Sequence, residues 1–171
     1  MNFRIENVIP MSAQGLWAVL HTPEFDAFMA REYGLKIYSE LEKNLSDKMM
    51  QRRLRVVTTV NLNFVMQMIY DQILGKAELE YEVIQEKCLN RYAMYWEIVP
   101  PVLVDKFRFS GMIRLKPIDE KRCLMIREGN IQIDISMGKL ILESIIATKS
   151  KIMKHRFRQL VEKWKYEKLI A

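Results

Sequence analysis

Apolar residues recur at spacings of three and four along the last part of the chain, from Met137 to Ala171. This spacing places them on one side of a helix with 3.6 residues per turn. The pattern predicts one long amphipathic helix whose apolar side carries Leu142, Ile145, Ile146, Ile152, Met153, Phe157, Leu160, Val161 and Trp164. Such a helix is stable only when its apolar side is packed, so the upstream chain must cover it.

The beginning of the chain predicts a strand followed by two short helices. Residues 2–9 alternate as a strand, with Phe3 on its apolar face. The side chains of Ser12 and Thr22 can each accept a hydrogen bond from a free amide in the first turn of a helix. The second helix is expected to end near Gly34.

After Gly34 the apolar pattern changes to a period of two. It predicts a hairpin of two strands, Leu35–Lys43 and Lys48–Thr58, because the residues between them form turns readily. On the first strand Ile37 and Leu41 are expected to face the core together with Leu35.

Arg52 is in phase with the apolar Met50 and Leu54 of the second hairpin strand. Its side chain either reaches inward to a polar partner or lies at the rim of the sheet. The rim is the favoured interpretation, because burial of an unpaired charge is costly.

The remaining strands are expected at Glu78 onward, Arg91–Val99, Val104–Lys116 and Arg122–Ile135. On the last strand Leu124 and Ile126 should face inward, and the phase then slips by one residue before Ile131. Gly129 is the expected site of a β-bulge that absorbs this slip. Residues 62–74 have helical spacing and are expected to form a short covering helix or a lid.

These elements predict one α+β domain over residues 1–171. About seven strands form a curved antiparallel sheet wrapped around the long C-terminal helix, with two short helices after the first strand. The segments Ile9–Ala13 and Thr22–Phe25, and the later segments 110–115, 129–135 and 138–143, resemble START-like (SRPBCC) domains. That superfamily includes polyketide cyclases and birch-pollen allergens, and the resemblance is to one of its uncharacterised branches. It implies a helix-grip fold whose cavity, between sheet and last helix, usually holds a lipid, sterol, isoprenoid or aromatic molecule.

A hydrophobic ligand in such a cavity would contact large apolar side chains of the inner strand faces and the helix. The candidates are Tyr81, Met94, Trp96, Phe107, Phe109, Leu142, Ile146, Met153 and Phe157. Twelve methionines suit an adaptable interior of this kind. The same side chains also fit a filled core, so an interaction scaffold is the alternative function.

No catalytic residues are predicted, because the sequence has no nucleophile motif, phosphate loop or metalloprotease motif. Glu97, Asp134 or Arg127 would face a cavity only if the strand registers shifted. Cyclase-like activity is therefore a less favoured alternative to binding.

The net charge of +6 is concentrated at the end of the chain. Residues 149–171 contain 8 Lys and Arg against 2 Asp and Glu, whereas the preceding residues contain 19 of each kind. Lys151, Lys154, Arg158 and Lys165 lie on the polar side of the predicted helix. This surface could meet an anionic membrane, an acidic protein partner or only solvent. Nucleic acid is not an expected partner, because the helix aromatics lie on its apolar side.

Cys88 and Cys123 lack metal-binding or redox spacing, and the only histidines are His21 and His155. We therefore expect no metal and no cofactor. The N-terminus lacks the apolar run of a signal peptide, and the longest uncharged run, Val56–Tyr70, has fifteen residues, too few to span a bilayer. These features predict an intracellular protein that is soluble or peripherally membrane-associated.

Overall fold

A computed structural model describes residues 2–59, 78–100, 107–133 and 155–169 of the chain. Their strands form one antiparallel sheet in the order β1-β7-β6-β5-β4-β3-β2. The elements are β1 (Asn2–Ile9), α1 (Ala13–Val19), α2 (Pro23–Tyr33), β2 (Leu35–Leu45), β3 (Met49–Thr59), β4 (Glu78–Cys88), β5 (Ala93–Val99), β6 (Phe107–Asp119) and β7 (Arg122–Ile133).

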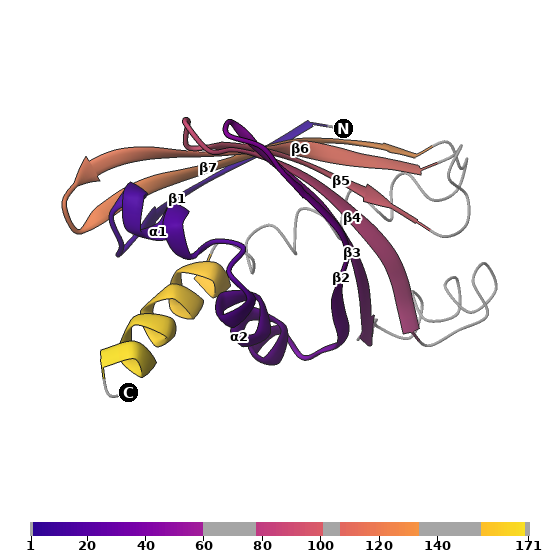
Figure 1. Ribbon diagram of the computed structural model, residues 1–171, viewed down its shortest axis with the longest axis horizontal. Coiled ribbons are helices and arrows are strands. Elements are labelled where there is room, and N and C mark those ends of the chain that lie inside the picture. Colours follow the sequence, from indigo (N-terminus) through magenta and orange to yellow (C-terminus); the bar gives the residue numbers. More distant parts are fainter. Residues whose placement is uncertain (1, 60–77, 101–106, 134–154, 170–171) are drawn as a thin grey trace.

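The sheet is bent into an arch, and the helices lie on its concave side (Figure 1). The described part of the C-terminal helix, residues 155–169, runs beside α1 and α2 at one end of this arch. The predicted helix-grip fold, with its strand, two short helices, six further strands and final helix, is confirmed. The predicted covering segment 62–74 lies outside the described residues.

The boundaries of the two short helices follow from the capping residues that the sequence contains. The Ser12 hydroxyl accepts a hydrogen bond from the Gly15 amide at 3.0 Å, and the Thr22 hydroxyl accepts one from the Phe25 amide at 3.3 Å. Gly34 ends α2 in the left-handed conformation, with φ of 65°, which glycine adopts without strain. These expectations are confirmed.

The apolar core lies where the three helices meet one end of the sheet. The C-terminal helix contributes Phe157, Leu160, Val161 and Trp164, which are between 0% and 8% exposed. Trp164 makes edge-to-face contacts with Phe25 and Phe28 of α2, each at 5.2 Å between ring centroids. The predicted apolar side of the helix is therefore packed over its described length, and its contacts fasten α2 to the fold.

Strand β2 does not follow the predicted alternation. Ile37 and Leu41 are 37% and 48% exposed, whereas Tyr38 is the side chain directed toward α2. The cause is two register shifts in the pairing with β3, between Leu35 and Ile37 and between Glu40 and Glu42. Because β2 is at the edge of the sheet, its pairing can be irregular without disturbing a second neighbour.

Strand β7 also differs from its predicted phase. Its ladder with β6 is continuous from Ile133 to Cys123, so Gly129 is not a bulge, and the register shift lies between Pro117 and Asp119 instead. The inner positions of β7 are therefore the odd-numbered ones, and Arg127 occupies one of them.

Ile126 suggested the wrong phase because it is apolar. It lies on the outer face, where it is nevertheless only 2% exposed. Its ladder partners there are Glu6 and Arg114, and the ion pairs of Glu128 with Arg4 and Arg114 lie on the same face. The long side chains of such pairs can shelter an isoleucine from water, so its burial does not require the inner face.

Candidate ligand-binding site

Three aromatic rings gather on the concave face, away from the helix-packed end. The rings of Trp96 and Phe109 meet edge to face at 4.8 Å between centroids. Phe3 lies 5.9 Å from Phe109 and 6.4 Å from Trp96. All three side chains are partly exposed. We call Phe3, Trp96 and Phe109 the aromatic cluster.

Two glycines explain how these rings reach their positions. Gly111 pairs with Trp96 on one side and with Gly129 on the other, and Gly129 pairs with Phe3. A Cβ atom on Gly111 would lie 2.7 Å from Trp96 Cζ2, and one on Gly129 would lie 2.5 Å from the Phe3 ring. Because both glycines lack that atom, the rings can lie directly against the backbone of β6 and β7.

The structure brings together only some of the predicted lining residues. Trp96 and Phe109 are neighbours, whereas Met94 and Phe157 are 3% and 4% exposed and belong to the helix-packed core. Tyr81 is partly buried on β4, and burial raises the pKa of its phenol. The remaining predicted residues, namely the Phe107 side chain, Leu142, Ile146 and Met153, lie outside what the structure describes.

Phe3 is missing from the predicted lining, although its strand and face were expected. The signal that would have placed it is the pairing of Gly111 with Gly129, which aligns Trp96 and Phe3 on one row across four strands. Predicting this pairing requires the correct phase of β7, and the apolar character of Ile126 indicated the wrong one.

Arg127 stands between the aromatic cluster and the helix-packed core. It precedes Gly129 by two residues, so its side chain leaves the same face of β7. Its guanidinium carbon lies 4.5 Å from the centroid of the Phe157 ring, and its Nε donates to the sulfur of Met125 at 3.4 Å. Burial lowers the pKa of this guanidinium, because the cation has lost much of its water.

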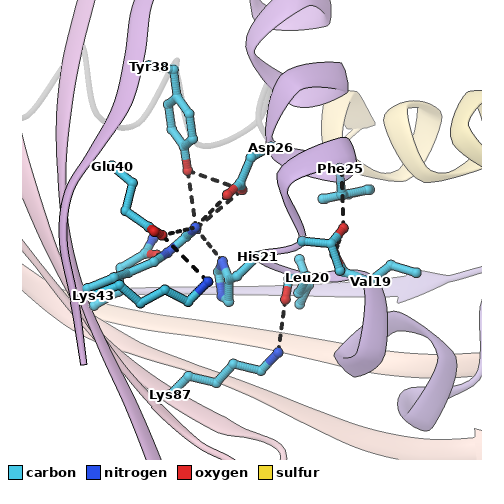
Figure 2. A network of polar contacts seen from close by, with 12 residues as sticks. Val19, Leu20, His21, Phe25, Asp26, Tyr38, Glu40, Lys43 and Lys87 are labelled. Carbon is cyan, nitrogen blue, oxygen red and sulfur yellow. Dashed lines mark hydrogen bonds and ion pairs between the residues drawn. The ribbon is translucent and has the colours of Figure 1, made fainter. Parts of the chain in front are cut away.

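A network of polar side chains lies on the concave side of β2, β3 and β4 (Figure 2). The Arg52 side chain is fully buried, which corrects the favoured placement at the rim. It forms an ion pair with Asp26 at 2.5 Å and donates to the amide oxygen of Gln85 at 2.7 Å. Tyr38 and Glu40 complete its surroundings at 3.3 and 3.7 Å. The burial is tolerated because the charge is paired and its donors are used.

His21 joins this network from the turn between α1 and α2. Arg52 can only donate, so His21 Nδ1 must accept its hydrogen bond, at 2.5 Å. The proton of the neutral ring is then on Nε2, which points to the sulfur of Met94 at 2.8 Å. Burial, followed by the charges of Arg52 and Lys87, lowers the pKa of His21 to about 2. The imidazole is therefore neutral near pH 7.

Lys87 extends the polar network to the end of α1. Its ammonium donates to the backbone carbonyls of Trp17 at 2.6 Å and Leu20 at 2.9 Å, which helical hydrogen bonds leave unused. Burial, followed by the charge of Arg52, lowers its pKa to about 8. The network thus ties both short helices to the sheet, and its groups are occupied by one another.

The predicted basic surface is described for two of its four residues. Arg158 is exposed and pairs with Glu162 at 3.0 Å, and the exposed Lys165 donates to the Pro10 carbonyl at 2.7 Å. Lys151 and Lys154 lie outside the described residues. No helix in the described ranges has the length and apolar character needed to cross a membrane. Within the same ranges, no group of three or more His, Cys, Asp or Glu residues could hold a metal ion.

The opposite, convex face carries a shallow depression of about 620 Å³. Its lining includes Arg4, Tyr95, Met112 and Glu128, which point away from the aromatic cluster because they alternate with its residues along the strands. Phe3, Gly111 and Gly129 also contribute to the lining. The Arg4–Glu128 ion pair lies in this depression, so its charged groups are already paired.

Comparison with solved structures shows where this architecture recurs. A START superfamily protein from Mycobacterium smegmatis has a TM-score of 0.65 and 8% identity, over 95% of this chain and 98% of that chain. The Zhui aromatase/cyclase from Streptomyces sp. R1128 has a TM-score of 0.61 and 11% identity, over 94% and 90%. Norcoclaurine synthase from Thalictrum flavum, in complex with dopamine and hydroxybenzaldehyde, has a TM-score of 0.66 and 13% identity, over 98% and 87%.

These similarities show that the chain has the helix-grip fold of START-like proteins, as the sequence resemblance implied. No protein-family profile matches the sequence, and no curated protein matches it. The similar structures include both enzymes and other proteins, so the fold alone assigns no reaction.

Proposed function

We propose that this protein binds a hydrophobic small molecule, such as a lipid, sterol, isoprenoid or aromatic compound, on the concave face of its sheet. The observation that carries this proposal is the aromatic cluster. Phe3, Trp96 and Phe109 are large apolar side chains on an inner sheet face, yet each keeps part of its surface exposed. The apolar side chains at the helix-packed end are instead buried.

Binding would cover this aromatic surface and release the water in contact with it. An apolar ligand gains about 25 cal/mol for each Å² of apolar surface removed from water, and aromatic contacts add to this gain. A concave surface with clustered rings and a few polar groups is typical of small-molecule sites.

The two alternatives predict a different use of the same surface. An interaction scaffold would have the rings covered by other parts of the protein, and no ligand would enter. A cyclase-like enzyme would need an acid or base beside the rings. Of the three candidates, Glu97 occupies the outer face with Ser110, its partner on β6, and Asp134 lies outside the described residues. Arg127 faces inward, but a guanidinium stays protonated and cannot act as a base. Binding without catalysis is therefore the function that this arrangement supports best.

A neutral fluorescent probe tests the proposal. Pyrenebutanol should bind the protein saturably, with a rise in fluorescence. Phe109→Trp should weaken its binding about tenfold by overfilling the site. Met112→Trp is the matched control, because Met112 lies on the outer face of the same strand and is 40% exposed. If both folded variants bind like the original protein, the concave face is not the binding site.

The basic side of the C-terminal helix fits the same function. A protein that carries a hydrophobic molecule must collect or release it, and an anionic membrane surface attracts exposed Lys and Arg. Arg158 is 58% exposed and therefore accessible to such a surface. An acidic protein partner would use the same charges, and binding to anionic vesicles separates the two.

A further inference from the structure

Arg127 differs from the other arginines in the described ranges. Most of them lie within 4 Å of a carboxylate, namely Arg4, Arg31, Arg52, Arg53, Arg55, Arg114, Arg122 and Arg158. Of the described arginines that do not, Arg91, Arg108 and Arg156 are exposed, so water solvates their charge. Arg127 is sheltered and has no carboxylate partner among the described residues.

Among the described residues, the contacts of Arg127 leave most of its hydrogen-bonding capacity unused. A guanidinium has five N–H donors, and the Phe157 ring and the Met125 sulfur are weak partners for a cation. Loss of water around it already lowers its pKa. An unpaired cation in a sheltered position is costly, and the cost falls when an anion binds beside it.

The position of Arg127 relative to the aromatic cluster suggests where that anion would come from. Arg127 and Gly129 occupy successive inner positions of β7, about 7 Å apart. Phe3 is the β1 partner of Gly129, and its ring lies over that glycine. A ligand that covers the rings can therefore reach the guanidinium with one end.

We propose that the ligand of this site is an amphipathic monocarboxylate, whose apolar body covers the aromatic cluster and whose carboxylate pairs with the guanidinium of Arg127. This assignment rests on the proposed function and specifies the ligand class. A planar guanidinium binds a carboxylate through two parallel hydrogen bonds.

A single negative charge fits the surroundings better than a double one. Burial raises the pKa of the nearby Tyr33 phenol, although the charges of Arg127 and Arg156 act in the opposite direction. Tyr33 therefore stays neutral and can only add a hydrogen bond. A phosphate monoester carries between about 1.5 and 2 charges near neutral pH, so part of its charge would be uncompensated in a sheltered site. A carboxylate is balanced by Arg127 alone.

A matched pair of probes tests the charge separately from the apolar body. Pyrenebutyric acid and pyrenebutanol share the same aromatic body and differ at the carboxylate. The original protein should bind the acid at least about tenfold more tightly than the alcohol at pH 7.5. Arg127→Met should remove this preference and leave the affinity for the alcohol within about twofold, because the added contact is to the charge.

Two further variants control for folding and for general charge. Arg127→Lys keeps the charge but loses the paired hydrogen bonds, so its preference for the acid should be intermediate. Arg108→Met removes one charge from the exposed outer face of β6 and should leave both affinities unchanged. Circular dichroism of each variant confirms that it is folded.

The outcomes distinguish the two proposals. Binding of neither probe to the original protein would refute the proposed function itself. Equal affinity for acid and alcohol, or equal loss of both in Arg127→Met, would refute the carboxylate assignment while leaving hydrophobic binding intact. A preference for the acid that persists in Arg127→Met would place the anion elsewhere and also overturn the assignment.

Discussion

The two ends of the concave face contain similar side chains and use them differently. At the helix-packed end, Trp164 is 8% exposed and contacts Phe25 and Phe28 edge to face. In the aromatic cluster, Trp96 makes comparable contacts with Phe3 and Phe109, but all three rings are partly exposed. The first arrangement gains stability from complete burial. The second leaves part of its apolar surface exposed.

The comparison shows that a ring contact alone does not distinguish a core from a binding surface. What differs among the described elements is whether a helix packs over the rings. Trp164 belongs to the helix that closes its end of the arch, so its burial is part of the folded state. The rings of the aromatic cluster lie on the sheet, and within the described part of the chain Arg127 beside them has no carboxylate partner, which is why we propose this end as the ligand site.

Replacing one tryptophan at each end should give the largest contrast. Trp164→Ala should lower the free energy of unfolding by about 3–5 kcal/mol, the usual cost of removing a large buried side chain. Trp96→Ala should cost only about 1–2 kcal/mol, because its ring keeps water contact in the folded state. Urea unfolding of both variants measures the difference. Equal costs would mean that Trp96 belongs to the structural core.

Removing an ion-pair partner from the polar network should lower the free energy of unfolding almost as much as removing a ring from the apolar core. Asp26→Ala leaves the fully buried Arg52 without its closest anion, so we expect a loss of about 3 kcal/mol in the free energy of unfolding. Glu40→Ala is the matched control, because Glu40 is 3.7 Å from Arg52 and partly exposed, and it should cost less than about 1 kcal/mol. Similar losses in urea unfolding for both carboxylates would show that the network has no dominant pair.

Much of the fold could be predicted because local signals agree with the final structure. Ser12, Thr22 and Gly34 set the helix boundaries through hydrogen bonds and backbone conformations that each residue favours by itself. The alternation on β5, where Met94 and Trp96 face inward, was equally clear. Such features depend on residues that are close together in the chain, so they can be recognised in a single sequence.

The parts that could not be predicted depend on partners distant in sequence. Arg52 is buried because Asp26, Gln85 and His21 contact it from three other segments. No spacing of residues along the chain predicts these contacts. Arg127 was assigned to the wrong face because the apolar Ile126 beside it was expected to face inward, whereas Ile126 lies on the outer face and is still only 2% exposed. Predicting the candidate site therefore requires the strand registers, whereas predicting the fold does not.

Acid should weaken the helix-packed end through His21. Its pKa is about 2 in the folded protein and about 6.5 in an unfolded chain, so between these values the unfolded state binds more protons. The free energy of unfolding should therefore decrease as the pH falls below 6.5, by up to about 1.4 kcal/mol per pH unit. Urea unfolding between pH 7 and 5 measures this slope, before most carboxylates titrate.

A variant that lacks only His21 isolates the contribution of this residue. Asparagine tolerates the left-handed backbone that His21 adopts, with φ of 75°, so His21→Asn should flatten the slope between pH 7 and 5 even if it lowers stability at pH 7. His155→Asn changes an exposed histidine on the C-terminal helix and should leave the slope as it is. An unchanged slope in His21→Asn would assign the acid sensitivity to another group.

The smallest effect should come from the basic side of the C-terminal helix, which belongs to neither end of the concave face. Each exposed Lys or Arg contributes about 1 kcal/mol near an anionic membrane, and the attraction fades with salt because the Debye length is about 10 Å at 0.1 M. We expect weak sedimentation with anionic liposomes at low salt and none with neutral ones.

Reversing Lys154 and Arg158 to Glu should weaken this liposome binding, but modestly. Arg158 is already paired with Glu162, so part of its charge is compensated in the folded protein. The charge-matched control reverses Lys116 and Lys121, exposed residues at the hairpin between β6 and β7, which should leave sedimentation unchanged if docking uses the helix. Equal weakening by both pairs would show that net charge alone draws the protein to the membrane. Identical sedimentation with neutral and anionic liposomes would instead leave an acidic partner or solvent as the counterpart of this surface.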